Sequence, residues 1–108
     1  MAAVSLCVIN HNGADRLLAA LASALAAPQP FDEVLVVDNA STDGGIELAR
    51  ARYPQVRVVA MPRNAGPGSA RNAGFAAAAN DLILFQDNDV RLEPGCAATL
   101  LAALRERP

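Results

Sequence analysis

Four short apolar runs, rich in β-branched residues and separated by segments of helical pattern, constrain the fold of this chain more than any other feature. The runs occupy residues 4–10, 33–38, 56–61 and 81–86. All but the third, which Arg57 interrupts, are nearly continuous in hydrophobicity, as strands covered on both faces of a parallel sheet tend to be. Apolar residues at helical spacing occupy 14–27, 44–53, 67–79 and 94–107. This alternation predicts an α/β fold: an open, mainly parallel, Rossmann-like sheet of about four strands with flanking helices.

Prolines mark the predicted helix boundaries, and no internal linker divides the chain. Pro54 follows the second helical segment, whereas Pro67 and Pro94 stand where a first helical turn accepts a residue without an N–H. Residues 1–108 are therefore expected to form a single domain. Because the chain stops at Pro108, directly after a predicted helix, we expect it to be the first part of a longer domain.

Charge and cysteine content argue against several classes of partner. The formal net charge is -2, and all nine basic residues are arginines spread along the chain, so we expect no nucleic-acid partner. The two cysteines have no paired spacing, which indicates reduced thiols in a cytosolic protein. No apolar run is long enough to span a bilayer. We expect a cytoplasmic protein, with peripheral attachment to the inner face of the membrane left open for the full-length protein.

Ligands of open α/β sheets bind at the carboxyl ends of the strands, so the residues that leave each predicted strand, its exit, are the ones to examine. Every exit is polar and rich in Asp or Asn, beyond what turn preference alone requires. The four exits are NHNG (10–13), DNASTDG (38–44), PRNAG (62–66) and DND (87–89).

The last exit places two carboxylates, Asp87 and Asp89, one residue apart. Like charges this close destabilise the fold unless a cation or a set of hydrogen bonds offsets them. A divalent metal shared with a substrate phosphate is one interpretation, because Mg²⁺ and Mn²⁺ usually take one or two carboxylates. A solvated turn is the other, because Asp and Asn side chains bond nearby backbone groups. This stretch alone does not choose between them.

A glycine-rich segment, GPGSARNAG at residues 66–74, opens the third helix. Its free N–H groups would bind a phosphate, and Arg71 would add a guanidinium; a plain helix start with a solvated Arg71 is the alternative. Gly74 is expected to allow close packing of the helix on the sheet. A dinucleotide-binding domain is disfavoured, because the first exit has NHNGAD where G-x-G-x-x-G is required.

The strands with their exits resemble, in order along the chain, the N-terminal half of a family 2 glycosyltransferase with the GT-A fold: VSLCVINHNG, EVLVVDNASTDG, PRNAGPGSARNAG and QDNDVRLEPG. Each motif is weak alone, but four in the right order make a specific signal. The resemblance covers essentially the whole chain. It implies a nucleotide-sugar-binding domain, 1–108, of an enzyme of cell-wall or polysaccharide biosynthesis.

The resemblance also implies a role for individual residues at the nucleotide. Asp38 would hydrogen-bond the base, and Asn10 and Asn12 would line the nucleoside pocket. Arg71 would lie near the base or the phosphates. Other residues of the second and third exits are assigned to the same nucleotide-sugar site: Asn39, Arg63, Asn64 and Gly66.

The stretch Asp87-Asn88-Asp89 matches the Asp-x-Asp motif of that family. The resemblance implies that Asp89 binds a divalent metal, Mn²⁺ or Mg²⁺, and that Asp87 lies beside the metal or the ribose of the donor. Metal held there would neutralise the charge that develops on the leaving diphosphate. An inverting transfer also needs a general base. In the family that base lies well beyond this motif, so no catalytic base is assigned in this chain.

Two departures from the family pattern bear on the donor. The second exit has Asp38-Asn39-Ala40-Ser41 where many members have a second Asp and a Gly. This variant resembles the branch that transfers deoxysugars such as rhamnose from dTDP donors, so the expected donor is a UDP- or dTDP-sugar, with the acceptor unknown. His11 stands where the family often has Tyr, which would alter stacking on the base; a lone His in a loop is otherwise solvated.

Two functions from other classes stay open. A nucleotide-binding module without transferase chemistry would bind nucleotide without needing metal or either aspartate of the last exit. A structural or interaction domain would bind no nucleotide and would associate with itself through the open sheet edge or an apolar surface. Some self-association, as a homodimer, is expected in any case, because a short sheet leaves an edge exposed.

Overall fold

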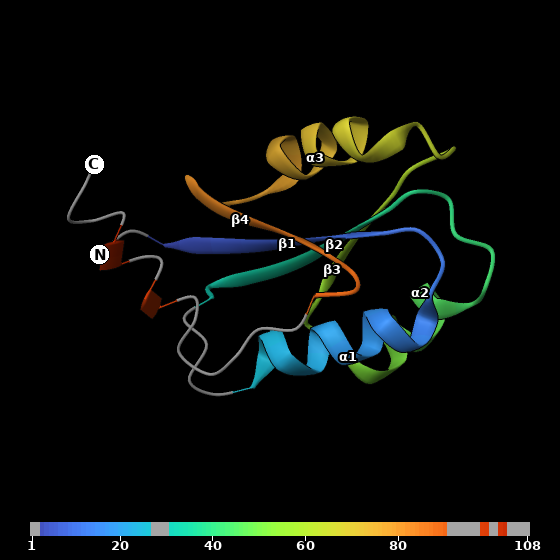
Figure 1. The fold of residues 1–108 in the computed structure, drawn as a ribbon, viewed down its shortest axis with the longest axis horizontal. Helices are drawn as coiled ribbons and strands as arrows, with labels where there is room; N and C mark the ends of the chain where they lie inside the picture. The colour runs from blue at the N-terminus through green and yellow to red at the C-terminus, as the bar shows by residue number, and fades with distance from the viewer. Residues whose placement is uncertain (1–2, 27–30, 91–97, 100–101, 104–108) are drawn as a thin grey trace.

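The computed structural model describes residues 3–26, 31–90, 98, 99, 102 and 103, and shows one parallel sheet between two layers of helices (Figure 1). Neighbouring strands are parallel and follow the order β3-β2-β1-β4. The described elements are β1 (Val4–Asn10), α1 (Ala14–Leu25), β2 (Glu33–Asp38), α2 (Gly45–Arg52), β3 (Arg57–Ala60), α3 (Gly66–Ala77) and β4 (Leu82–Asp87). The predicted α/β fold class is confirmed.

The observed elements begin and end within two residues of their predicted bounds. The fourth predicted helix, 94–107, lies outside the described residues apart from 98, 99, 102 and 103, which are helical. The structure corrects one expectation, that the run 81–86 is covered on both faces. Its apolar residues are only half-buried, because β4 lies at an edge of the described sheet and α3 contacts mainly β1, β2 and β3.

Each face of the sheet has its own apolar core, because successive residues of β1 and β2 point to opposite sides. Leu6 and Val8 face α1 and α2, which lie below the sheet in Figure 1, whereas Cys7 and Ile9 face α3 above it. All seven residues of β1 are buried. Full burial of a Leu or Val side chain stabilises the fold by about 1.5–3 kcal/mol, so β1 carries a large share of the stability.

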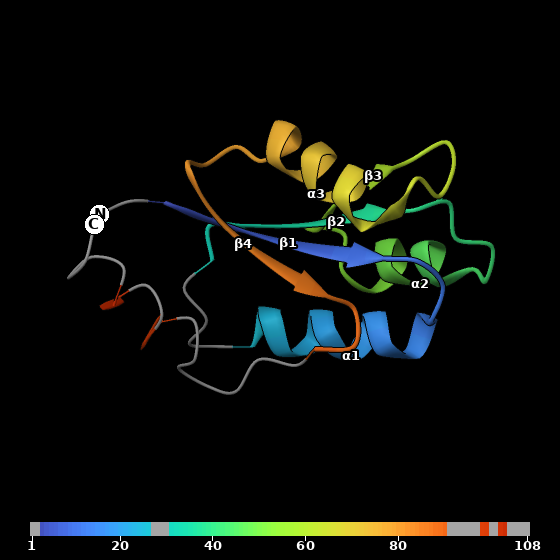
Figure 2. The same cartoon turned by 45° about the horizontal axis from the view of Figure 1, so that its top comes forward.

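The register of the strands brings three of the four exits together (Figure 2). Asn10, the last residue of β1, is opposite Asp38, the last residue of β2. On the other side of β1, Ile9 is opposite Asp87, the last residue of β4. Because all strands are parallel, the carboxyl ends of β1, β2 and β4 meet at one edge of the sheet.

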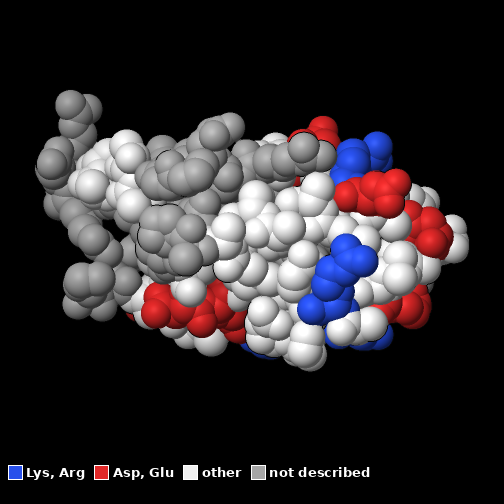
Figure 3. All heavy atoms as spheres, turned by 90° about the horizontal axis from the view of Figure 1, so that it is seen from below, with Lys and Arg blue, Asp and Glu red and all other residues white. Residues whose placement is uncertain are grey.

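Charged side chains are mixed in sign on the side of α1 and α2. On the face drawn in Figure 3, blue Arg and red Asp or Glu side chains lie interspersed among uncharged ones over the described atoms. This distribution agrees with the spread of arginines along the sequence.

Gly74 allows α3 to lie close to the sheet. A Cβ added at Gly74 would lie 2.5 Å from the Sγ of Cys7 and 3.3 Å from atoms of both Phe85 and Val37. Cys7 is fully buried in β1, so it has little room to move away. The close approach of helix and sheet therefore depends on the missing side chain, as the sequence predicts.

We expect Gly74→Ala to lower the free energy of unfolding by about 1–3 kcal/mol, because the new methyl group overpacks the core on the α3 side. The control is Gly68→Ala in the same helix, where a Cβ would meet nothing within 4 Å. That change should leave stability unaltered or raise it by up to about 1 kcal/mol. Urea denaturation followed by circular dichroism measures both. Equal stability of Gly74→Ala and the unchanged chain would contradict the packing argument.

Glu33 joins the strands at their amino-terminal ends, opposite the edge of the sheet that carries the exits. Its Oε1 accepts hydrogen bonds from Ser5 Oγ (2.8 Å) and from the N–H of Ala79 (2.9 Å), just after α3. Its Oε2 pairs with Arg57 Nη1 at 2.6 Å. Glu33 thus ties the beginnings of β1, β2 and β3 to the end of α3. A hollow of about 510 Å³ beside this cluster lies at the amino-terminal edge of the sheet, away from the strand exits.

The pKa of Glu33 makes this edge sensitive to pH. Burial by itself raises the pKa of the Glu33 carboxyl, but the hydrogen bond from Ala79 and the hydrogen bond and charge of Arg57 outweigh it. The pKa is therefore held below its ordinary value of 4.5. A carboxyl with a lowered folded-state pKa stabilises the fold above its unfolded-state pKa, and this contribution is lost as the pH falls through the folded-state pKa.

We expect Glu33→Gln to lower the free energy of unfolding at pH 7, because the neutral amide loses the ion pair with Arg57. The difference from the unchanged chain should shrink as the pH falls below about 4.5, where Glu33 of the unfolded chain is itself protonated. Urea unfolding at a series of pH values measures this. A difference that is the same at pH 3 and pH 7 would contradict the assignment of the charge to this cluster.

Candidate functional site

The first and second exits are joined by a buried hydrogen-bond cluster around Asp38. Asn10 and Asp38 are 1% and 5% exposed, and Asn10 Nδ2 donates to Asp38 Oδ1 at 2.8 Å. Ser41 folds back on the same carboxylate: its Oγ donates to Asp38 Oδ1, and its N–H donates to Oδ2 at 3.0 Å. Buried polar groups need such partners, so the cluster holds the two exits in one geometry.

The backbone of the first exit is shaped by the second. Asn12 has a positive φ of 54°, its N–H donates to Ser41 Oγ at 2.7 Å, and its Oδ1 accepts from the N–H of Thr42 at 2.9 Å. His11, for which the sequence left stacking on the base and plain solvation open, also contacts the second exit. Its ring is exposed, but Nδ1 lies 2.6 Å from the carbonyl oxygen of Asn39, so that nitrogen carries the proton.

The third exit reaches the second through Gly66, the first residue of α3. Asn64 Oδ1 accepts from the N–H of Gly66 at 3.1 Å, and Asn39 Nδ2 donates to the carbonyl oxygen of Gly66 at 3.3 Å. Gly66 has a φ of 89°, which favours glycine. Arg63 and Arg71 are both exposed. Ala65, which precedes α3, makes no side-chain cap bond, so the N–H groups beyond Gly66 and Pro67 are compatible with an anion site.

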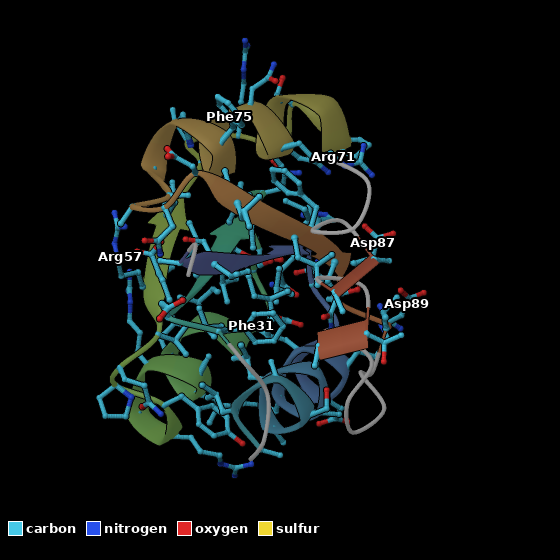
Figure 4. All side chains as sticks on the ribbon, turned by 90° about the vertical axis from the view of Figure 1, so that its left-hand side faces the viewer. Phe31, Arg57, Arg71, Phe75, Asp87 and Asp89 are labelled. Carbon is cyan, nitrogen blue, oxygen red and sulfur yellow. The ribbon has the colours of Figure 1, made fainter. Side chains whose placement is uncertain are left out.

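The two carboxylates of the fourth exit point away from the protein, whereas the residue between them points in. Asp87 and Asp89 are exposed and project from the end of β4, on the same side of the molecule as Arg71 (Figure 4). Asn88 is half-buried, and its Nδ2 donates to Asn10 Oδ1 at 2.8 Å and to the carbonyl oxygen of Asn12 at 3.0 Å. The fourth exit is therefore bonded to the first.

These carboxylates fit the demands of a hard divalent cation. Among the described residues, neither has a hydrogen-bond or ion-pair partner, and no group of three or more His, Cys, Asp or Glu gathers anywhere. A cage made of protein ligands alone is thus absent from the described part of the chain. Two exposed carboxylates suit Mg²⁺ or Mn²⁺, which complete their coordination with water and substrate phosphates.

The comparison with protein families identifies the family of the chain. The model described as Glycosyl transferase family 2 matches residues 5–108. The chain belongs to glycosyl transferase family 2. The resemblance stated from the strand exits is thereby confirmed.

Curated relatives of this family 2 chain are several times longer than the chain. Succinoglycan biosynthesis protein ExoO of Rhizobium meliloti (strain 1021) is 42% identical over 92 residues, which cover 84% of this chain and 26% of that protein. N-acetylglucosaminyl-diphospho-decaprenol L-rhamnosyltransferase of Mycobacterium tuberculosis (strain ATCC 25618 / H37Rv) is 34% identical over 105 residues, which cover 87% of this chain and 33% of that protein. The chain thus spans about a quarter to a third of the length of these relatives.

Solved structures confirm the GT-A fold of the family 2 chain. Mannosyltransferase PcManGT from Pyrobaculum calidifontis, solved in complex with GDP-Man and Mn²⁺, has a TM-score of 0.80 and 25% identity, covering 96% of this chain and 32% of its own. The structure of S. aureus TarS 1-349 has a TM-score of 0.75 and 27% identity over the same shares of each chain. In the described residues, no helix has the length and apolar character needed to cross a membrane.

Three residues of the site were not singled out from the sequence of this family 2 chain. Ser41 and Asn88 hold the exits together, and Asp43 bonds the first N–H groups of two helices, those of Ala14 and Gly45, both at 3.0 Å. The hydrogen bond from Gly45 is the main cause that lowers the pKa of the Asp43 carboxyl. Short polar residues in the loop after a strand commonly bond the local backbone, a signal that predicts Ser41 and Asp43, three and five positions after β2, as turn residues.

We expect Ser41→Ala to lower the free energy of unfolding by about 1–3 kcal/mol, because the N–H of Asn12 loses its acceptor and Asp38 loses a donor. The control is Thr42→Ala in the same loop, where the side chain is exposed. That surface change should alter stability by less than about 0.5 kcal/mol. Thermal and urea unfolding measure both. Similar effects of the two changes would contradict the role given to Ser41.

Proposed function

We infer that this chain is the donor-binding part of a glycosyltransferase, which binds a nucleoside-diphosphate sugar through a divalent metal for inverting transfer to an acceptor of unknown identity. One observation carries the proposal. A continuous series of hydrogen bonds runs from the turn that bears Asp87 and Asp89, through Asn88 and Asn10, to Asp38. The position implied for the metal and the position implied for the base are thus built as one unit.

Asp38 is proposed to bind the base of the donor. Its carboxylate accepts three hydrogen bonds within the protein, which leaves capacity for one more on a group with about four acceptor positions. A carboxylate pairs with a ring N–H, which uracil, thymine and guanine have and neutral cytosine lacks. Asn10, Asn12 and Asn39 would keep Asp38 and the loops around it in place beside the nucleoside.

The phosphates are proposed to lie between α3 and the fourth exit. In the first turn of α3 the N–H of Gly66 is bonded by Asn64 and Pro67 has none, so the turn would offer a phosphate its following N–H groups, beginning with that of Gly68. Exposed Arg63 and Arg71 supply positive charge on a chain whose formal net charge is -2. These groups would bind and orient the diphosphate before transfer.

Asp87 and Asp89 are the residues that would hold Mn²⁺ or Mg²⁺, with Asp89 as the principal ligand. The metal, when bound, offsets the negative charge that develops on the leaving diphosphate. The complex of PcManGT with GDP-Man and Mn²⁺ supports this proposal by likeness of fold. The base that activates the acceptor hydroxyl is expected in a part of the enzyme beyond these residues, so this chain alone would bind donor without transferring it.

The donor is proposed to be a UDP- or dTDP-sugar. The L-rhamnosyltransferase of Mycobacterium tuberculosis among the relatives supports a deoxysugar, whereas the GDP-Man complex of the structural neighbour brings guanine into the range to be tested. Self-association stays a prediction: among the described residues β4 pairs with β1 alone, and Phe75 on α3 is 69% exposed (Figure 4).

Calorimetric titration of UDP, dTDP and GDP, each with and without Mn²⁺, tests the proposal. We expect at least one of them to bind more tightly with Mn²⁺, and Asp89→Ala to weaken that binding by at least roughly tenfold, because one of two carboxylate ligands is lost. Asp81→Ala is the matched control, since it removes an exposed carboxylate just before the other end of β4. CDP should bind more weakly than the preferred nucleotide.

Two outcomes would contradict the proposal. Binding that is equally tight in the unchanged chain and in Asp89→Ala, with no effect of Mn²⁺, would favour a nucleotide-binding module without transferase chemistry. Absence of binding for all three nucleotides would contradict a donor site formed by these exits.

A further inference from the structure

We propose that Asn88 is a positioning residue that couples the metal-binding carboxylates to the base-binding carboxylate, so that metal and nucleoside strengthen the binding of each other. The inference rests on the proposed function, because it assumes that Asp87 and Asp89 hold metal and that Asp38 holds the base. The inference assigns a role to Asn88, the middle residue of the stretch 87–89, whose side chain is half-buried whereas those of Asp87 and Asp89 are exposed.

Both hydrogens of the Asn88 amide are used on the first exit. A side-chain amide carries two N–H donors. Asn88 Nδ2 gives one to Asn10 Oδ1 at 2.8 Å and the other to the carbonyl oxygen of Asn12 at 3.0 Å. These partners lie 78 and 76 residues away in the sequence. The turn that bears the carboxylates is thereby fixed to β1 and to the loop that follows it.

Asn10 links Asn88 to Asp38, and only one orientation of its side-chain amide makes both hydrogen bonds. Its Oδ1 faces the amide of Asn88, and its Nδ2 faces Asp38 Oδ1 at 2.8 Å. Turning the Asn10 amide over would set an oxygen against a carboxylate and an N–H against another N–H, so the series of bonds has one direction. Asn10 is 1% exposed, and hydrogen bonds in such a low-dielectric setting polarise one another.

Among the described residues, the turn is also closed by two hydrogen bonds within its own segment of chain. Gln86 Nε2 donates to the carbonyl oxygen of Val90 at 2.6 Å, and the N–H of Val90 donates to the carbonyl oxygen of Asp87 at 3.1 Å. These bonds close the turn, and strand pairing sets Asp87 opposite Ile9 of β1, but neither fixes Asp89 relative to β1. Metal ligands must be held to within about 0.5 Å, so the cross-strand bonds of Asn88 decide where Asp89 stands relative to the first exit.

Coupling of this kind works in both directions. A base bound at Asp38 restrains Asp38 and Asn10, and through Asn88 it restrains the turn that carries Asp87 and Asp89. By thermodynamic linkage, metal bound at the turn must favour the nucleoside by the same factor. The measurable quantity is the metal enhancement, defined as the ratio of the nucleotide dissociation constants without and with Mn²⁺.

We expect Asn88→Ala to reduce the metal enhancement about tenfold, as loss of residues that orient metal ligands typically does. Asn80→Ala is the matched control, because Asn80 Nδ2 donates to Ser5 Oγ at 3.0 Å on the far edge of the sheet. That change should lower stability and leave the enhancement as it is. Calorimetry with the preferred nucleotide measures the ratio, and the electron paramagnetic resonance signal of free Mn²⁺ measures metal affinity directly. Circular dichroism verifies that each variant is folded.

Asn88→Asp separates positioning from direct ligation and serves if the alanine variant fails to fold. It keeps the shape of the side chain and adds a third carboxylate to the motif, but it places negative charge against the oxygens of Asn10 and Asn12. We expect the enhancement to fall below that of the unchanged chain. An enhancement that rises in Asn88→Asp, or is unchanged in Asn88→Ala, would overturn the inference. An unchanged chain that binds no nucleotide would instead contradict the proposed function, and the inference with it.

Discussion

The pairing of β1 with β2 on one side and β4 on the other is the constraint on which the rest of this structure depends. Every residue of β1 is buried, by neighbouring strands at its edges and by helices on both faces. The free energy released by that burial sets the register, because a slip by one residue would exchange the two faces of the strand. The same register sets Asn10 opposite Asp38 and Ile9 opposite Asp87, which builds the site.

Burial also explains why the site is a hydrogen-bond network rather than a set of separate side chains. Asn10 and Asp38 lie at the ends of buried strands, where a polar group without a partner costs about 1–3 kcal/mol. Each therefore bonds to a neighbouring exit, and these bonds arrange the loops. Not all of the polar groups are satisfied: in the described part of the chain, Asn39 Oδ1 and Gln86 Oε1 are buried without a partner. Both belong to residues at or next to strand exits.

The succession of strands and helices along the chain and the polar character of the exits could be predicted, because both depend on local patterns in the sequence. A buried parallel strand needs a continuous apolar run, and a helix beside it needs apolar residues at helical spacing, so both leave a signal in the sequence. Gly74 was predicted to sit at a helix-to-sheet contact for a similar reason. The run 81–86 was predicted to be covered on both faces, but its apolar residues are only half-buried. An apolar run does not indicate whether its strand is central or at an edge of the sheet.

The sequence by itself determined the alternating α/β plan, the family 2 pattern and the residue types that stand at the exits. It did not determine which exits touch. The strand order, the inward turn of Asn88, the fold-back of Ser41 and the bond of His11 to the second exit were decided by the tertiary structure. The reason is physical: a hydrogen bond between residues 78 positions apart leaves no periodic signal, because it exists only after burial of β1 has brought the strand ends together.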